Sequence, residues 1–107
     1  MKVTSAFEFM FSAAVRLPGA TGAKKHLHGH NYRLQVILDG EVDEAMVRQT
    51  VREAALERAD HHMLNDVIPE PSAANVAKWF FAELKPKLPQ LIEVALWPTA
   101  EHCVRVS

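Results

Sequence analysis

Hydrophobic and polar residues alternate along two long segments in the first part of the chain. In residues 3–15 the aromatic residues Phe7, Phe9 and Phe11 are interleaved with Glu, Met and Ser, and in about residues 29–38 an apolar series is interleaved with Arg, Gln and Ile. A period of two places successive side chains on opposite faces of a β-strand. Turn-forming residues at 17–22 separate the segments. The pattern therefore predicts a long antiparallel hairpin with one buried face.

Two segments with helical spacing follow. Apolar residues recur every three or four positions in residues 43–59, where Asp43 is a suitable N-cap. A second helix is predicted from a cap at Ser72 through Leu84 or Lys87, with an inner face of Val76, Trp79, Phe80 and Leu84. The stretch between the two helices, residues 60–66, has no clear period.

Two shorter strands are predicted at the end of the chain, in residues 91–97 and about 102–106, around a turn at residues 98–100. The predicted order is thus ββααββ. Such an order is typical of an α+β fold, here a four-stranded antiparallel sheet with two helices on one face. Neither a linker nor an internal repeat interrupts the pattern, so residues 1–107 are expected to form a single domain.

Composition and charge restrict the kind of partner. The formal net charge is −1 and the acidic and basic residues are interspersed, so the chain lacks the basic stripe that binds nucleic acid. It has no run of about 18 apolar residues and no secretory leader pattern, which predicts a soluble cytoplasmic protein that does not enter membranes. The lone Cys103 cannot form an internal disulfide.

Candidate chemistry is concentrated at the start of the second predicted strand, where His26, His28 and His30 alternate. Residues two apart on a strand point to the same side about 6.6 Å apart, so the rings of His28 and His30 can converge on one ion while Gly29 leaves room between them. Neutral imidazole is the commonest metal ligand in proteins. His26 lies about 13 Å from His30 in a straight strand and reaches the same ion only if the backbone bends. The alternative is that all three are polar residues on the wet face of a strand.

Four motifs in this order resemble the family of 6-pyruvoyl-tetrahydropterin synthase and 6-carboxytetrahydropterin synthase, the enzyme of the queuosine pathway. They are FSAAVRL at residues 11–17, HGHNY at 28–32, DHHMLND at 60–66 and PSAANVAKW at 71–79. The resemblance implies the tunnelling fold, in which sheets of neighbouring subunits join into a barrel, trimers stack into hexamers and active sites lie between subunits. It also implies a homo-oligomer that acts on a pterin or a related purine-derived heterocycle.

The resemblance carries over to individual residues. In the family three histidines hold a zinc ion, and His28 and His30 match two of them. Asp60 and His61 match an Asp-His pair that assists proton transfer, and His62 belongs to the same motif. In such a pair the carboxylate fixes the imidazole tautomer and raises its basicity.

The sequence departs from the family pattern at several of its functional positions. The third zinc histidine falls at Val15, and the cysteine base falls among residues 22–25, which contain no cysteine. The glutamate that anchors the pterin precedes a threonine, where this chain has Pro98 before Thr99; Glu101 follows and could reach the pocket only if the turn were rearranged. Because catalytic zinc normally has three protein ligands, a site with His28 and His30 needs another donor, such as His26 or a group from substrate or a neighbouring subunit.

Three hypotheses follow from these observations. The chain is a lyase-type enzyme with an altered active site, an oligomeric binding protein that keeps the fold without the chemistry, or a structural oligomer whose histidines serve assembly. The retained His-Gly-His and Asp-His-His motifs argue against free drift of the sequence, while the departures make the standard synthase reaction doubtful. We lean to a lyase-like pterin synthase homologue with an altered active site.

Overall fold

The computed structural model describes residues 1–17 and 27–107 and shows a single four-stranded sheet in these ranges. Its strands are β1 (Thr4–Val15), β2 (His28–Asp39), β3 (Leu91–Thr99) and β4 (His102–Val106). They lie in the order β1-β2-β3-β4, and each neighbouring pair is antiparallel. The predicted hairpin and sheet are confirmed, although β3 continues to Thr99 and so includes two of the three residues predicted to form a turn.

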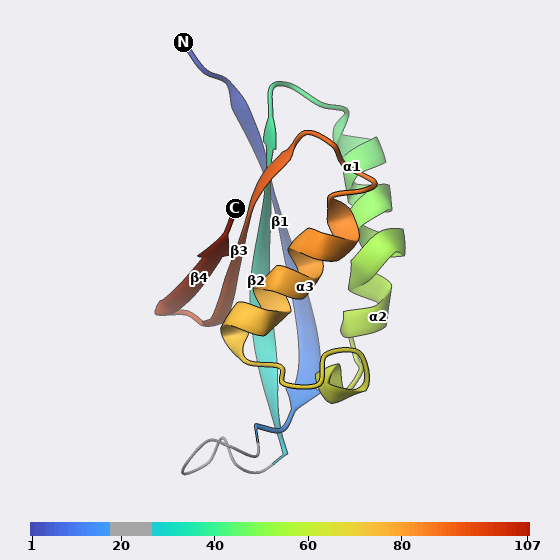
Figure 1. The fold of residues 1–107 in the computed structure, drawn as a ribbon, viewed down its shortest axis with the longest axis vertical. Helices are drawn as coiled ribbons and strands as arrows, with labels where there is room; N and C mark the ends of the chain where they lie inside the picture. The colour runs from blue at the N-terminus through green and yellow to red at the C-terminus, as the bar shows by residue number, and fades with distance from the viewer. Residues whose placement is uncertain (18–26) are drawn as a thin grey trace.

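The helices cover one face of this sheet (Figure 1). The first helical segment is continuous but changes type along its length: α1 (Glu44–Val51) passes into the π-helical η2 (Arg52–Leu56) and then into α2 (Glu57–Ala59). After the short 3-10 helix η3 (Leu64–Asp66), α3 (Ala73–Leu84) crosses the sheet. The predicted caps are confirmed, since Asp43 accepts from the Met46 amide at 3.0 Å and Ser72 from the Asn75 amide at 3.2 Å.

The core lies between the sheet and the helices. The alternating apolar residues of β1 and β2 point into it, and Leu34, Val36 and Leu38 are completely buried. Val76, Phe80 and Leu84 of α3 meet them from the other side, as the sequence pattern predicts. In the apolar series of residues 43–59, Met46 is an exception because 47% of it is exposed. In the described part of the chain, no helix has both the length and the apolar character needed to span a membrane.

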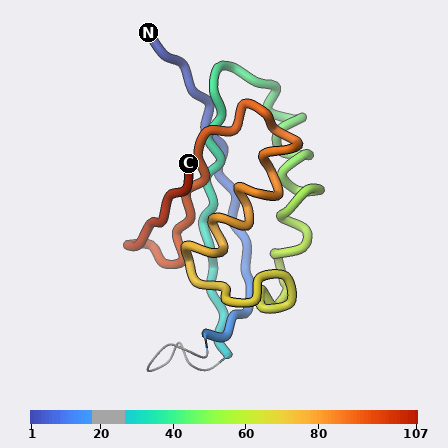
Figure 2. The backbone as a smooth tube through the Cα atoms, in the orientation of Figure 1, coloured from blue at the N-terminus to red at the C-terminus, as the bar shows by residue number. Residues whose placement is uncertain are grey.

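The segment between α2 and α3 returns to the sheet. Figure 2 shows the chain leaving α2 and passing beside the end of β1 before it enters α3. There Met63 forms a parallel bridge with Ala14 of β1. This contact positions the candidate site.

Candidate functional site

The histidines that open β2 lie on the same face as the core residues. In the strand register His28 is opposite Val15 and His30 is opposite Ala13, both of which are buried. The ring centroids of His28 and His30 are 4.7 Å apart, and the His30 ring lies 5.4 Å from that of Tyr32. The two imidazoles are thus close together, as their spacing in the sequence predicts.

These two rings do not make a complete zinc site by themselves. The position opposite His28 belongs to Val15, an aliphatic residue that is 1% exposed. Among the described residues there is no group of three His, Cys, Asp or Glu side chains that could hold a metal ion. A catalytic zinc normally takes three protein ligands, so the described donors do not fit the expected ion. His26, the predicted substitute ligand, lies outside the described residues.

The second half of the predicted site lies along the outer edge of β1. The Ser12 amide donates to Oδ1 of Asp60 at 3.0 Å, and the Ser12 carbonyl accepts from the His61 amide at 2.6 Å. The Ala14 amide in turn donates to the His62 carbonyl at 3.0 Å. Residues 60–63 therefore pair with β1 much as a short additional strand would. The sequence shows no period here, so pattern alone could not reveal this pairing.

His61 has an unusual backbone and an exposed side chain. Its φ of 59° lies in the left-handed region, which histidine enters more readily than most residues but at some energetic cost. The side chain is 80% exposed, and its Nε2 lies 3.7 Å from Oδ1 of Asp60. That separation is longer than a hydrogen bond but places the imidazole beside a carboxylate that the Ser12 amide holds in position.

His62 takes a different role from its neighbour. Its Nδ1 lies 2.8 Å from the Asp60 carbonyl oxygen. Because a carbonyl can only accept, Nδ1 must carry the proton of this bond. This bond fixes the tautomer of His62 and ties its ring to the backbone of the Asp60–His61 pair.

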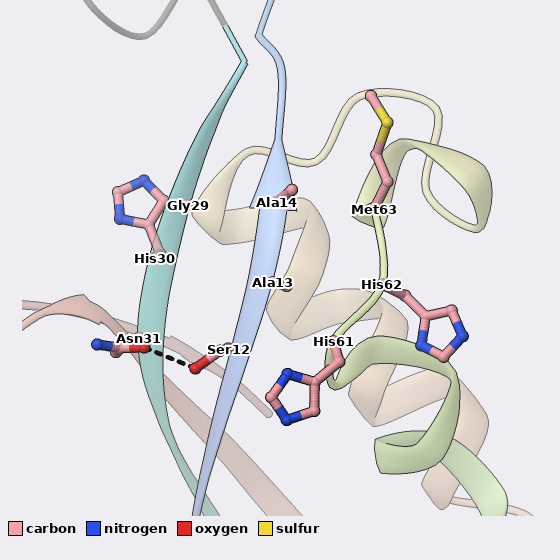
Figure 3. Close-up of a pocket in the computed structure, with 9 residues that line it drawn as sticks. All are labelled: Ser12, Ala13, Ala14, Gly29, His30, Asn31, His61, His62 and Met63. Carbon is pink, nitrogen blue, oxygen red and sulfur yellow. Dashed lines mark hydrogen bonds between the residues drawn. The ribbon is translucent and has the colours of Figure 1, made fainter.

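An open hollow of about 590 Å³ joins the two halves of the site (Figure 3). Much of its lining comes from the sheet face opposite the helices, and the lining residues are Ser12, Ala13, Ala14, Gly29, His30, Asn31, His61, His62 and Met63. The Ser12 hydroxyl lies 2.6 Å from Oδ1 of Asn31, to which it donates. In Figure 3 His30 and His61 border this hollow on opposite sides of β1.

The structure bears on two expectations about individual residues, Gly29 and Glu101. A Cβ atom at Gly29 would meet the Ala13 carbonyl oxygen at 3.8 Å, an ordinary van der Waals distance, so glycine is not required there for space. Glu101 is exposed in the turn between β3 and β4. It is not among the described residues that line the hollow. A pterin contact by Glu101 stays a prediction.

Comparison with known proteins agrees with this architecture. The family model described as "6-pyruvoyl tetrahydropterin synthase" matches residues 4–107. The chain belongs to this family. The family membership and the α+β fold predicted from the four motifs are thereby confirmed.

Several relatives can be compared directly. A Pyrococcus furiosus protein named dihydroneopterin monophosphate aldolase is 27% identical over 78% of this chain and 80% of its own length. An Archaeoglobus fulgidus protein named putative 6-carboxy-5,6,7,8-tetrahydropterin synthase is 36% identical over 72% of this chain and 71% of its own length. The solved structure of Caenorhabditis elegans 6-pyruvoyl tetrahydropterin synthase has a TM-score of 0.86 and 25% identity, covering 99% of this chain and 95% of the other. The chain is thus similar in sequence to proteins of more than one named activity.

Proposed function

We propose that this protein is a lyase that breaks a carbon–carbon bond in the side chain of a phosphorylated dihydropterin, with Asp60 and His61 as the proton-transfer pair. The observation that carries the proposal is the position of His61. Its exposed imidazole borders the hollow, its backbone is held in the left-handed region, and a fixed carboxylate stands 3.7 Å behind it. Backbone strain of this kind is concentrated at functional sites.

The chemistry needs one base at a substrate hydroxyl. His61 removes the proton from the hydroxyl on the second side-chain carbon, which becomes an aldehyde as its bond to the first carbon breaks. The electron pair of that bond passes into the C=N bond of the dihydropterin ring. The proton then returns to the first carbon, so no oxidant or reductant is required. Asp60 stands beside the imidazole and orients it for the transfer.

Two further observations favour cleavage over the synthase reaction. The Pyrococcus furiosus relative carries the name of an aldolase that acts on dihydroneopterin monophosphate. The resemblance places the third zinc histidine of the synthases at Val15, which is buried opposite His28 and has no donor atom. The proposed cleavage needs only proton transfer by residues of this chain, and none of its steps uses a metal ion. Zinc at His28 and His30 stays a separate prediction.

The same proposal includes the assembly of the protein. The chain forms one domain, residues 1–107, and this domain associates with further copies of itself. The support comes from the sheet, in which β1 and β4 are the two edge strands and residues 60–63 cover β1 at positions 12–14. Edge strands with unpaired backbone groups favour pairing, and a ring of subunits satisfies them.

Conversion of dihydroneopterin monophosphate to a phosphorylated aldehyde tests the function. The wild type should release the aldehyde, and H61Q should lower the rate by about 10²- to 10⁴-fold, the usual contribution of a general base. D60N should lower it by a smaller factor because it leaves the imidazole in place. His102, exposed on β4, provides the matched control H102Q, which should retain activity.

The other results are equally informative. Full activity in H61Q would contradict the assignment of the base. Formation of a 6-pyruvoyl or 6-carboxy product from the triphosphate would favour the synthase reaction instead. Binding of the pterin without turnover would favour the alternative of a non-catalytic binding protein.

A further inference from the structure

A second, smaller hollow lies on the sheet face opposite the helices. It encloses about 170 Å³, and its lining residues are Met10, Asn31, Arg33, Trp97, Thr99 and Ala100. Asn31 also lines the larger hollow beside His61. The two hollows are therefore adjacent along β2, with one side chain bordering both.

Arg33 is held in a defined position within this second hollow. Its guanidinium carbon lies 4.0 Å from the centre of the Trp97 ring, directly across the strand pair. Its Nε lies 3.9 Å from Oε1 of Glu8, and in the described part of the chain this buried nitrogen has no hydrogen-bond partner. Stacking on an aromatic ring occupies the face of a guanidinium and leaves its N–H groups, which lie in the plane, to meet an acceptor.

We propose that Arg33 binds the phosphate ester of the substrate and so selects phosphorylated over unphosphorylated pterins. This inference rests on the proposed function. With His61 as the base, the pterin ring lies in the larger hollow, which His61 borders. Asn31 and Arg33 point to the same face two residues apart, and the strand spacing puts about 6.8 Å between them. A three-carbon side chain with its phosphate ester spans a comparable length, so the phosphate reaches Arg33 when the side chain lies beside Asn31.

The chemistry of the site fits a phosphate ester better than the uncharged, hydroxylated side chain of an unphosphorylated pterin. Arginine presents paired donors that match two phosphate oxygens at once, and such charge-assisted bonds are among the strongest that proteins make. Glu8 opposes the binding of an anion because its carboxylate lies on the same guanidinium. Removal of that charge should therefore strengthen phosphate binding, whereas removal of the Arg33 charge should weaken it.

The test compares dihydroneopterin monophosphate with dihydroneopterin in binding and turnover by the full-length protein. R33Q should raise the Kd of the phosphorylated pterin by about 10- to 100-fold, the loss expected for hydrogen bonds to a charged group. The Kd of the unphosphorylated pterin should stay within about twofold. R33K should give an intermediate loss because it keeps the charge without the paired geometry.

Two further variants test the sign and the location of the effect. E8Q should lower the Kd of the phosphorylated pterin alone, which is the opposite sign from R33Q. R52Q alters an exposed arginine of η2, in the helical layer, and should change neither Kd. Because R33Q also removes the stack on Trp97, thermal unfolding of each variant shows whether it has folded.

The results separate this inference from the proposed function. Equal losses for both pterins in R33Q, or no loss for either, would overturn the phosphate assignment even if the wild type cleaves its substrate. A wild type that prefers the phosphorylated pterin but does not cleave it, with the preference abolished in R33Q, would refute the lyase and support the phosphate site. A wild type that binds neither pterin would overturn both.

Discussion

Replacement of Val15 by histidine should create a zinc site in this protein. Val15 lies directly opposite His28 in the strand register, and residues so placed have Cβ atoms about 4.5 to 5.5 Å apart on one face. The rings of His28 and His30 are already 4.7 Å apart. A third imidazole in that position gives three nitrogen donors on one face, the usual protein complement of a catalytic zinc.

The expected stability change has two parts of opposite sign. Without metal, V15H places a polar ring at a position that is 1% exposed and replaces a smaller side chain. The two effects together should cost about 2 to 4 kcal/mol. Zinc at a hundredfold excess over its Kd returns about 2.7 kcal/mol. For a chain of 107 residues, 1 kcal/mol corresponds to about 4 °C in Tm, so zinc should raise the Tm of V15H by about 10 °C.

Thermal unfolding with added zinc and with a chelator measures both parts. The protein concentration is held fixed so that self-association contributes nothing to the difference in Tm. The control is V15H combined with H28A, which keeps the new imidazole but removes one of its two partners and should respond weakly to zinc. Two results would refute the reasoning. Either V15H fails to respond to zinc, or the wild type responds as strongly as V15H because another donor already completes its site.

Two further predictions concern the core. Burial raises the pKa of Tyr32, the single tyrosine of the chain, from 10.0 to about 12. The fold favours the neutral phenol, so this stabilisation is complete below pH 10 and about 3 kcal/mol of it is lost as the pH rises toward 12. Y32F should lose that pH dependence in denaturant unfolding, and an unchanged alkaline slope would contradict the assignment. Phe80 is fully buried with its ring 5.4 Å from that of Phe11, so F80A should cost about 3 to 5 kcal/mol in the same assay. A cost below about 1 kcal/mol would mean that α3 does not pack on β1 in this way.

The strands and helices were predictable because each of them buries one face. Alternation in β1 and β2 reveals a period of two, and the apolar series of α3 reveals a helical period, whatever the partner of each element is. The change of helix type at η2 was not predictable in this way. A π-helical turn inserts one residue into the hydrogen-bond pattern, and the apolar residues of Arg52–Leu56 fit an ordinary helix equally well.

The arrangement of the candidate site was predictable only in part. Alternation places His28 and His30 side by side because both lie on one strand. The contact of Asp60 with the Ser12 amide joins residues 48 positions apart, and it depends on an aperiodic segment pairing with the edge of β1. Likewise the stack of Arg33 on Trp97 follows from the register of β2 against β3, which the sequence pattern does not specify.

On β2 the residues of the core give way to the candidate site residues where burial ends, without a change in the sequence pattern. Leu34 and Tyr32 are 0% and 2% exposed, whereas His30 and His28, next on the same face, are only half-buried. The period of two continues without a break from the core into the site. Alternation therefore identifies the face on which a residue lies, but it does not locate the point at which the helices cease to cover that face. Beyond that point a histidine escapes the cost of full burial and keeps the rigidity of a paired strand, and both conditions favour a binding site there.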